Sequence, residues 1–361
     1  MMEKNQSATG TGELPPPTQS VEELRAAAYE HNRRAVTFRL QGKVDDAISE
    51  CLQALVAEPE NAYALNNLGY LLLERGLIDD ATSYFLQAVE SNPEYALAHN
   101  NLGLALMNQG QLELALCEFQ EASRVDESYA MPHRNLALVS YLLGRRDEAV
   151  EEYRTYFSLA PDDAEDADAR FNLGVALEES GRVYEAIAEY EKAIFARPQF
   201  AKALNNLGLI YLGRGETEKA LDYFERALSA DEGWTQARYN LALCHHARGE
   251  HEKAIEEFER VRAVEPEHLQ AASNLGVMYT TVQRFDDAIR VFEELVAMHE
   301  GQPTLHFNLG VAYRGKGMQR EAASQFQRVL ELEPQDSQRA IRASRELQAA
   351  QAEMAIDTNI M

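Results

Sequence analysis

The sequence has little of what secreted and membrane proteins depend on. Its three cysteines, Cys51, Cys117 and Cys244, are not spaced as a zinc or thioredoxin-like motif, which suits a reducing compartment. No apolar run is long enough to cross a bilayer, and the chain begins without a basic segment followed by an apolar one. We therefore expect a cytoplasmic protein without membrane insertion.

Basic residues are also scarce. Lys and Arg total 34 against 59 Asp and Glu, which gives a formal net charge of −25 at pH 7. Nucleic acid and anionic lipid are bound through clustered Lys and Arg, so neither is expected as a partner. The acidic exterior favours basic protein or peptide partners instead. The chain of 361 residues is 45% hydrophobic, which is enough to bury a sizeable core.

What the sequence has in abundance is a repeat of 34 residues. A Leu-Gly or Leu-Ala pair returns at this spacing, as in the NNLG copies that begin at Asn66, Asn100 and Asn205, and three residues are added once. The nine units are 28–61, 62–95, 96–129, 130–163, 167–200, 201–234, 235–268, 269–302 and 303–336.

The residues within a unit predict two helices and a turn. Position 20 is Ala in every unit and position 8 is Gly or Ala, so the helices can cross closely. Leu at position 7 and an aromatic ring at position 24 fill the space between them. Gly at position 15 separates the helices, and Pro at position 32 ends the second in six units. The sequence therefore predicts an all-α fold.

This pattern resembles the tetratricopeptide repeat family over nearly the whole chain. The resemblance implies an α-solenoid, a right-handed superhelix in which each first helix lines a concave groove and each second helix lies on the convex side. The pattern departs at Arg33 and Arg34 in the first unit, at Tyr156 in the fourth, and at Gln283, which replaces a turn glycine. We expect a solvent-facing first repeat and a distorted turn at Gln283.

The flanking segments differ from the repeats. Residues 1–18 are polar and Pro-rich, which predicts disorder, and Ser20 with Glu23 predicts a capping box at the first helix of a repeat domain spanning 19–336. Residues 337–354 predict a capping helix whose Ile341, Leu347 and Met354 face inward, followed by a tail at 355–361.

The added residues lie in an acidic stretch near 162–168. It lacks the glycine of a calcium-binding EF-hand loop, so we interpret it as a solvated joint between the fourth and fifth repeats. A second cluster, formed by Cys244, His245, His246 and His251, resembles a metal site in composition only. Adjacent residues of a helix point about 100° apart, so no metal and no cofactor is expected.

Asparagine stands at position 6 in eight of the nine units. At about 100° per residue this position lies opposite the face that packs within its own repeat, which places it on the predicted groove floor. An amide offers a donor and an acceptor, as an extended peptide backbone requires. The matching asparagines in the repeats of O-linked N-acetylglucosamine transferases bind peptide in this way, so the resemblance implies a peptide-binding ladder. The alternative is that these amides bond to adjacent helices or to water. The ladder residues are Asn67, Asn101, Asn135, Asn172, Asn206, Asn240, Asn274 and Asn308.

Apolar residues at positions 2 and 5 are the candidates for ligand selectivity, and the alternative is that they pack within the protein. They are Tyr29, Tyr63, Leu97, Met131, Phe171, Tyr239 and Phe307. The carboxylate clamp of some relatives is absent, because position 9 is never Asn.

The repeats leave 27 residues before them and 25 after, too few for a catalytic domain. No phosphate-binding loop or nucleophile elbow is present, so we expect no enzyme and no catalytic residue. The leading hypothesis is an adaptor or scaffold that binds an extended or helical segment of a partner protein in its groove. The second is a scaffold that associates with itself.

Overall fold

The computed structural model describes residues 20–161 and 166–360, the last six of these by their backbone alone. Residues 1–18, predicted to be disordered, and residues 162–165 of the acidic joint lie outside the described residues. The helices are α1 (Val21–Leu40), α2 (Val44–Ala57), α3 (Ala62–Glu74), α4 (Ile78–Ser91), α5 (Ala96–Asn108), α6 (Leu112–Val125), α7 (Ala130–Leu142), α8 (Arg146–Leu159), α9 (Ala167–Glu179), α10 (Val183–Ala196), α11 (Ala201–Gly213), α12 (Thr217–Ala230), α13 (Thr235–Ala247), α14 (His251–Val264), α15 (Leu269–Thr281), α16 (Phe285–Met298), α17 (Pro303–Gly315), α18 (Gln319–Leu332) and α19 (Gln338–Ile360).

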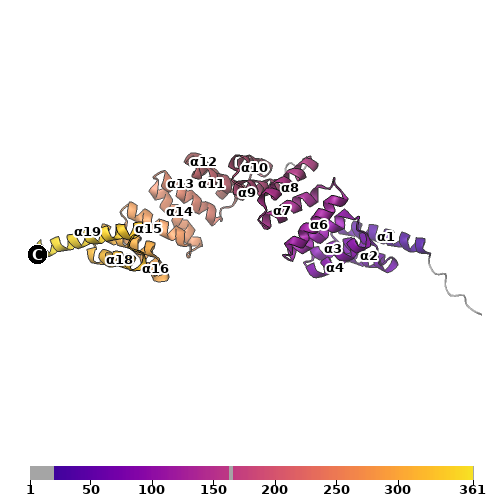
Figure 1. The fold of residues 1–361 in the computed structure, drawn as a ribbon, viewed down its shortest axis with the longest axis horizontal. Helices are drawn as coiled ribbons and strands as arrows, with labels where there is room; N and C mark the ends of the chain where they lie inside the picture. The colour runs from indigo at the N-terminus through magenta and orange to yellow at the C-terminus, as the bar shows by residue number, and fades with distance from the viewer. Residues whose placement is uncertain (1–19, 162–165, 361) are drawn as a thin grey trace, which may run out of the picture. The chain divides into compact units, whose positions relative to one another are not determined.

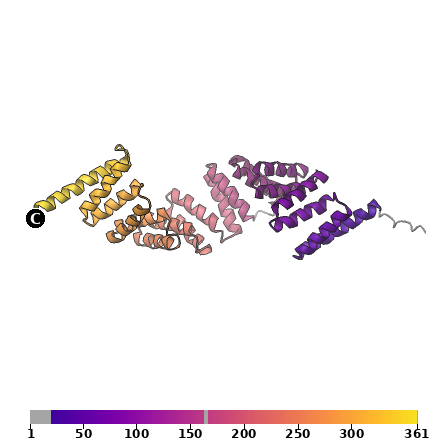
Figure 2. The same ribbon diagram turned by 90° about the horizontal axis from the view of Figure 1, so that it is seen from below.

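The all-α solenoid predicted from the sequence is confirmed. Each 34-residue unit contains two helices, and the described residues contain no strand. The chain divides into a first unit, residues 1–182, and a second unit, residues 183–361, with the division between α9 and α10. Within each unit successive helices pack on one another, and α19, yellow in Figures 1 and 2, lies beside α18.

Small residues set the close approach of paired helices. The position-20 alanines are fully buried in all nine repeats, and the position-24 side chains are at most 1% exposed. A Cβ atom built on Gly208 would lie only 2.5 Å from Cε1 of Phe224, so the glycine gives the ring its space. The same contact joins Gly310 of α17 to Phe326 of α18. The first unit and the second unit each bury their own clusters of such residues.

The turns between paired helices require a left-handed residue. Eight glycines hold this position with φ between 73° and 83°. Gln283 stands in the place of the ninth and adopts φ 61°, so the turn keeps its form and the strain falls on one glutamine. The distorted turn expected at this residue is therefore not observed.

The ends of the described chain confirm one prediction and correct another. Ser20 and Glu23 form the predicted capping box, because each side chain accepts a hydrogen bond from the backbone N–H of the other. Helix α19 runs to Ile360, past the predicted end at residue 354. Leu347 packs against the last core cluster as predicted, but Ile341 is 43% exposed and does not face inward. The buried face of α19 is formed by Ala340, Ala343 and Ala350 instead.

Tyr156, which departs from the repeat pattern, fastens α9 to the preceding repeat. Its hydroxyl donates to Asp166 at 3.1 Å, and Asp166 also accepts from Nε of Arg134 at 2.9 Å. Asp166 caps α9 by accepting from the backbone N–H of Ala169. Burial opposes ionisation of Asp166, but the hydrogen bonds from Ala169 and Arg134 prevail and lower the pKa of its carboxyl.

Candidate functional site

The ladder asparagines form hydrogen bonds between successive repeats. In four repeats the Nδ2 group at position 6 donates to the Oδ1 atom of the asparagine 35 residues earlier, at position 5 of the preceding repeat. The pairs are Asn67 to Asn32 at 2.7 Å, Asn101 to Asn66 at 2.9 Å, Asn135 to Asn100 at 2.9 Å and Asn240 to Asn205 at 2.8 Å. Three of the donors, Asn101, Asn135 and Asn240, are buried.

Tyrosine replaces the asparagine acceptor in other repeats. Asn274 donates to the hydroxyl of Tyr239, again 35 residues earlier, at 3.1 Å. Asn206 donates to the hydroxyl of Tyr190 on α10 at 3.2 Å, and Asn172 forms a hydrogen bond with Tyr153 on α8. The mid-helix asparagines therefore join neighbouring helices, which is one of the two alternatives that the sequence left open. Asn308 is half-buried on α17.

The amide-to-amide bonds leave one atom of each donor residue available. Among the described residues, no side chain donates to Oδ1 of Asn101 or Asn135, and neither oxygen is among the buried atoms that lack a partner. Both oxygens therefore reach solvent. Since Nδ2 is already used, the ladder presents acceptors at these two positions and not the donor-acceptor pair that the sequence suggested.

Apolar side chains at position 2 form a row on the first unit. Tyr29, Tyr63, Leu97 and Met131 are 66%, 53%, 39% and 38% exposed. They lie on α1, α3, α5 and α7, and each of these helices contacts the next one in that series. Tyr63 also packs on Tyr95, with 4.8 Å between ring centroids. We call these four residues the apolar row.

The position-5 candidates are less open. Phe307 is only 8% exposed and packs on Phe326, with the guanidinium of Arg342 5.1 Å from its ring. It therefore contributes to packing under α19. Tyr239 is half-buried, stacks on His268 at 5.1 Å and accepts the bond from Asn274. Phe171 is half-buried on α9.

A set of pairs within repeats was missed by the sequence reading. Histidine at position 4 faces Glu at position 23, with Nδ1 to Oε2 distances of 2.7 Å for His31 and Glu50, 2.7 Å for His99 and Glu118, and 2.6 Å for His133 and Glu152. Arg238 takes the same place opposite Glu257 at 2.9 Å, and His306 faces Gln325 at 2.7 Å. The constant separation of 19 residues was the signal that aligned repeats contained.

The environment of His99 favours its charged form. The hydrogen bond to Glu118 raises the pKa of His99, although burial opposes protonation, and the backbone carbonyl of Pro93 accepts from the other ring nitrogen. Two cysteines are shielded in the opposite sense. Burial raises the pKa of Cys51 to about 12 and that of Cys244 to about 11, so both thiols stay protonated near neutral pH.

No metal or membrane site stands out in what the structure describes. In residues 20–161 and 166–354, no group of three or more His, Cys, Asp or Glu side chains is arranged to hold a metal ion. The ring centroids of His246 and His251 lie 5.8 Å apart, while His245 faces Glu250. Among the same residues, no helix combines the length and apolar character needed to cross a bilayer.

The repeated helix pairs, their left-handed turns and their small-to-aromatic contacts agree with a comparison against protein families. It matches the tetratricopeptide repeat at residues 32–90, 73–130, 101–164, 134–199, 185–235, 205–268 and 280–337. The chain belongs to the tetratricopeptide repeat family. Tetratricopeptide repeats generally form protein-interaction scaffolds, and this general role applies to the chain. No curated protein matches it.

Solved structures share the fold. The C-terminal part of a tetratricopeptide repeat protein from Cytophaga hutchinsonii is 17% identical, with a TM-score of 0.58 over 67% of this chain and 97% of that one. PilF of Pseudomonas aeruginosa is 19% identical, with a TM-score of 0.53 over 60% of this chain and 96% of that one. YrrB, described as having an unusual peptide-binding site, is 22% identical, with a TM-score of 0.46 over 52% of this chain and 95% of that one.

Proposed function

We propose that this protein is a non-catalytic, cytoplasmic scaffold that binds an extended segment of a partner protein across the first helices of its first unit. The observation that carries this proposal is the apolar row beside the asparagine ladder. Single exposed apolar side chains are common, but four at one repeat position on successive, contacting helices form a surface that favours binding. At position 2 in α11, α13, α15 and α17 the second unit has Lys202, Gln236, Gln270 and Thr304 instead.

The open oxygens of the ladder favour an extended ligand. Asn101 and Asn135 have used their Nδ2 groups within the protein, so each offers Oδ1 to a donor. A helical ligand has satisfied most of its backbone N–H groups, whereas an extended one still has them free to donate. The apolar row then selects the side chains of the segment, and the oxygens hold its backbone.

The local composition favours an apolar segment over a basic one. At positions 2, 5, 6 and 9 of the first four repeats the sequence has no Asp or Glu, although the chain carries a net charge of −25. Two of these positions are Arg33 and Arg134. A preference for basic partners therefore draws no support from this surface, and the partner we propose is rich in apolar side chains.

The test uses random dodecapeptides displayed on phage, selected against the full chain and then measured by fluorescence polarisation. Leu97→Glu places a charge in the middle of the apolar row and is expected to weaken the selected peptides about tenfold or more. Gln270→Glu adds the same charge at position 2 in the second unit and should leave their affinity within about twofold. Selected peptides that bind Leu97→Glu as tightly as the parent would contradict the proposal.

Self-association is separated by a second measurement. Sedimentation velocity over a concentration series reports whether the protein forms dimers without any peptide. A dimer that is lost in Leu97→Glu would assign the apolar row to a second copy of the chain and overturn binding of a separate partner there.

A further inference from the structure

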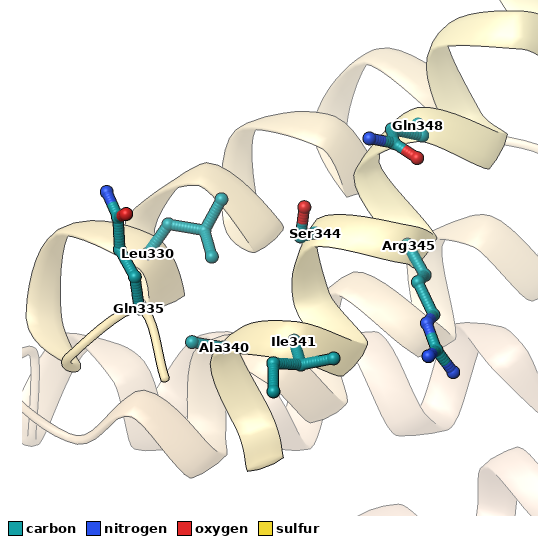
Figure 3. Close-up of a pocket in the computed structure, with 7 residues that line it drawn as sticks. All are labelled: Leu330, Gln335, Ala340, Ile341, Ser344, Arg345 and Gln348. Atoms are coloured by element: carbon teal, nitrogen blue, oxygen red, sulfur yellow. The ribbon is translucent and has the colours of Figure 1, made fainter. Parts of the chain in front are cut away.

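A pocket of about 450 Å³ lies between α18 and α19. Figure 3 shows Leu330 and Gln335 on one side and the α19 side chains Ala340, Ser344 and Gln348 on the other. Ile341 and Arg345 complete the lining, and Ile341 is 43% exposed. This surface belongs to the second unit, so it is separate from the apolar row.

The repeat register identifies what the pocket corresponds to. Ser344 stands 34 residues after Gly310, and Ala340 stands 34 residues after His306. Gly310 packs against the ring of Phe326, and His306 bonds to Gln325, both on the second helix of the ninth repeat. The α19 side of the pocket is therefore the face on which a first helix receives the second helix of its own repeat.

The sequence explains why this chain does not fill the face itself. Gln351 stands 34 residues after the turn glycine Gly317, and α19 continues through it to Ile360 without a turn. Position 20, which is Ala in all nine repeats, would fall on Ile356. The residues after 350 thus lack both the turn residue and the small residue that a paired second helix needs.

The charge around the pocket is opposite to that of the whole chain. Arg345 lines it, Arg342 is exposed on the same helix, and no carboxylate is among the lining residues. For the part of the chain that the structure describes, neither arginine takes part in an ion pair, whereas the nearby Arg314 and Arg339 pair with Glu346 and Glu333. Two unpaired guanidinium groups beside an apolar pocket complement an acidic ligand.

We propose that this pocket receives an acidic amphipathic helix from another protein, packed where a second helix packs in each repeat. The ligand helix inserts an aromatic side chain beside Ser344 and faces Arg345 with its carboxylates. The Cβ of Ser344 does not prevent this, because Ala242 in the seventh repeat also has one and buries beside the fully buried ring of Phe258. A second copy of this chain is disfavoured, because its net charge of −25 repels it.

The probe is a synthetic peptide with the sequence of α16, Phe285–Met298, labelled with fluorescein. It carries Asp286 and Asp287 in its first turn and the aromatic Phe292, and a lactam staple between positions 290 and 294 holds it helical. Both stapled positions are exposed in the protein, so the staple leaves the packing face unchanged. Binding to the full chain is measured by fluorescence anisotropy. The expected result is saturable binding that weakens as salt is added.

Variants assign the binding to the pocket. Ser344→Arg fills the pocket without removing positive charge and is expected to weaken the peptide about tenfold or more. The same replacement at Ser324, an exposed residue of α18 outside the lining, is the matched control and should change affinity less than about twofold. Arg345→Glu should weaken binding several-fold, roughly, and reduce its dependence on salt.

Three results would overturn the proposal. The first is no saturable binding of the α16 peptide, and the second is equal binding to Ser344→Arg and to the parent. The third is a dimer of the unliganded protein that Ser344→Arg abolishes, which would assign the pocket to a second copy. Thermal melting of each variant confirms folding, and Ile341→Glu serves as a second pocket variant if Ser344→Arg melts early.

Discussion

The two units repeat one fold but connect their helices with different polar pairs. In the first unit, His31, His99 and His133 each face a glutamate within their repeat. In the second, Arg238 takes the place of histidine opposite Glu257 and His306 faces Gln325. The hydroxyls of Tyr279 and Tyr313 also donate to Glu259 and Glu293 of the preceding repeat. The buried alanines and rings are common to both units, so these set the fold and leave the polar positions free to differ.

Their exposed first-helix surfaces also differ. The first unit carries the apolar row, whereas the same position in the second carries Lys, Gln and Thr. Amide-to-amide bonds follow one another in the first three ladder steps, while the second unit alternates asparagine and tyrosine acceptors. Binding and pH response are therefore expected to belong to different units, although the backbone repeat is the same.

The largest effect should come from removing a core ring in one unit only. Phe119→Ala in α6 and Phe292→Ala in α16 each delete a fully buried ring and should cost about 3 to 5 kcal/mol. Because a repeat contacts mainly its neighbours, hydrogen exchange followed by mass spectrometry should show lost protection in the unit that carries the change. Equal loss in both units for either variant would show that they unfold as one, and would remove the basis for comparing them.

The next effect contrasts two ladder asparagines. Asn135→Ala removes the donor to the buried Asn100, which should cost about 1 to 3 kcal/mol less the roughly 0.5 to 0.7 kcal/mol that Ala gains as a helix former. Asn308→Ala, on the half-buried position of α17, should gain about that propensity term instead. Urea denaturation measures both. The double variant Asn100→Ala with Asn135→Ala should recover part of the loss, and a loss equal to the two single effects added would exclude a direct bond.

The ladder shows what the sequence could predict and what it could not. The period, the small residues and the turn glycines determine how two helices of a repeat cross, so the fold followed from them. The helical wheel also gave the direction of each asparagine, away from its own second helix. It could not give the neighbour, because the bond to position 5 of the preceding repeat depends on how first helices stack.

Two further misses have the same origin. Ile341 was predicted to face inward from its apolar character, but the alanines of α19 pack closer to α18 and leave it at the pocket. Gln283 was expected to distort its turn, yet the packing of α15 on α16 holds the left-handed conformation and places the strain on one residue. In both cases tertiary packing decided between conformations that the local sequence allowed.

A smaller effect should distinguish the histidine pairs from their arginine counterpart. The pKa of His99 is raised in the folded protein, so its pair with Glu118 stabilises fully below the unfolded pKa of about 6.5 and this contribution is lost as pH rises through the folded value. The parent should lose stability between about pH 6 and pH 8.5 relative to His99→Gln, by about 1 kcal/mol or less. Arg238→Gln should cost the same at both pH values, since arginine stays charged. An unchanged difference between parent and His99→Gln across this range would contradict the prediction.

The smallest effect concerns the one turn at which the second unit departs from glycine. Gln283→Gly relieves a left-handed residue, a strain of about 1 to 2 kcal/mol, but it also gives the unfolded chain more freedom, so the net gain should be about 0.5 to 1 kcal/mol. The reciprocal change in the first unit, Gly110→Gln at φ 76°, should cost a similar amount, because no atom within 4 Å of an added Cβ blocks the side chain. Thermal melting with matched urea titrations measures both signs. If Gln283→Gly proved neutral while Gly110→Gln was costly, the eighth repeat would already compensate its glutamine through contacts of the side chain, and the two units would differ at their turns as well as in their polar pairs.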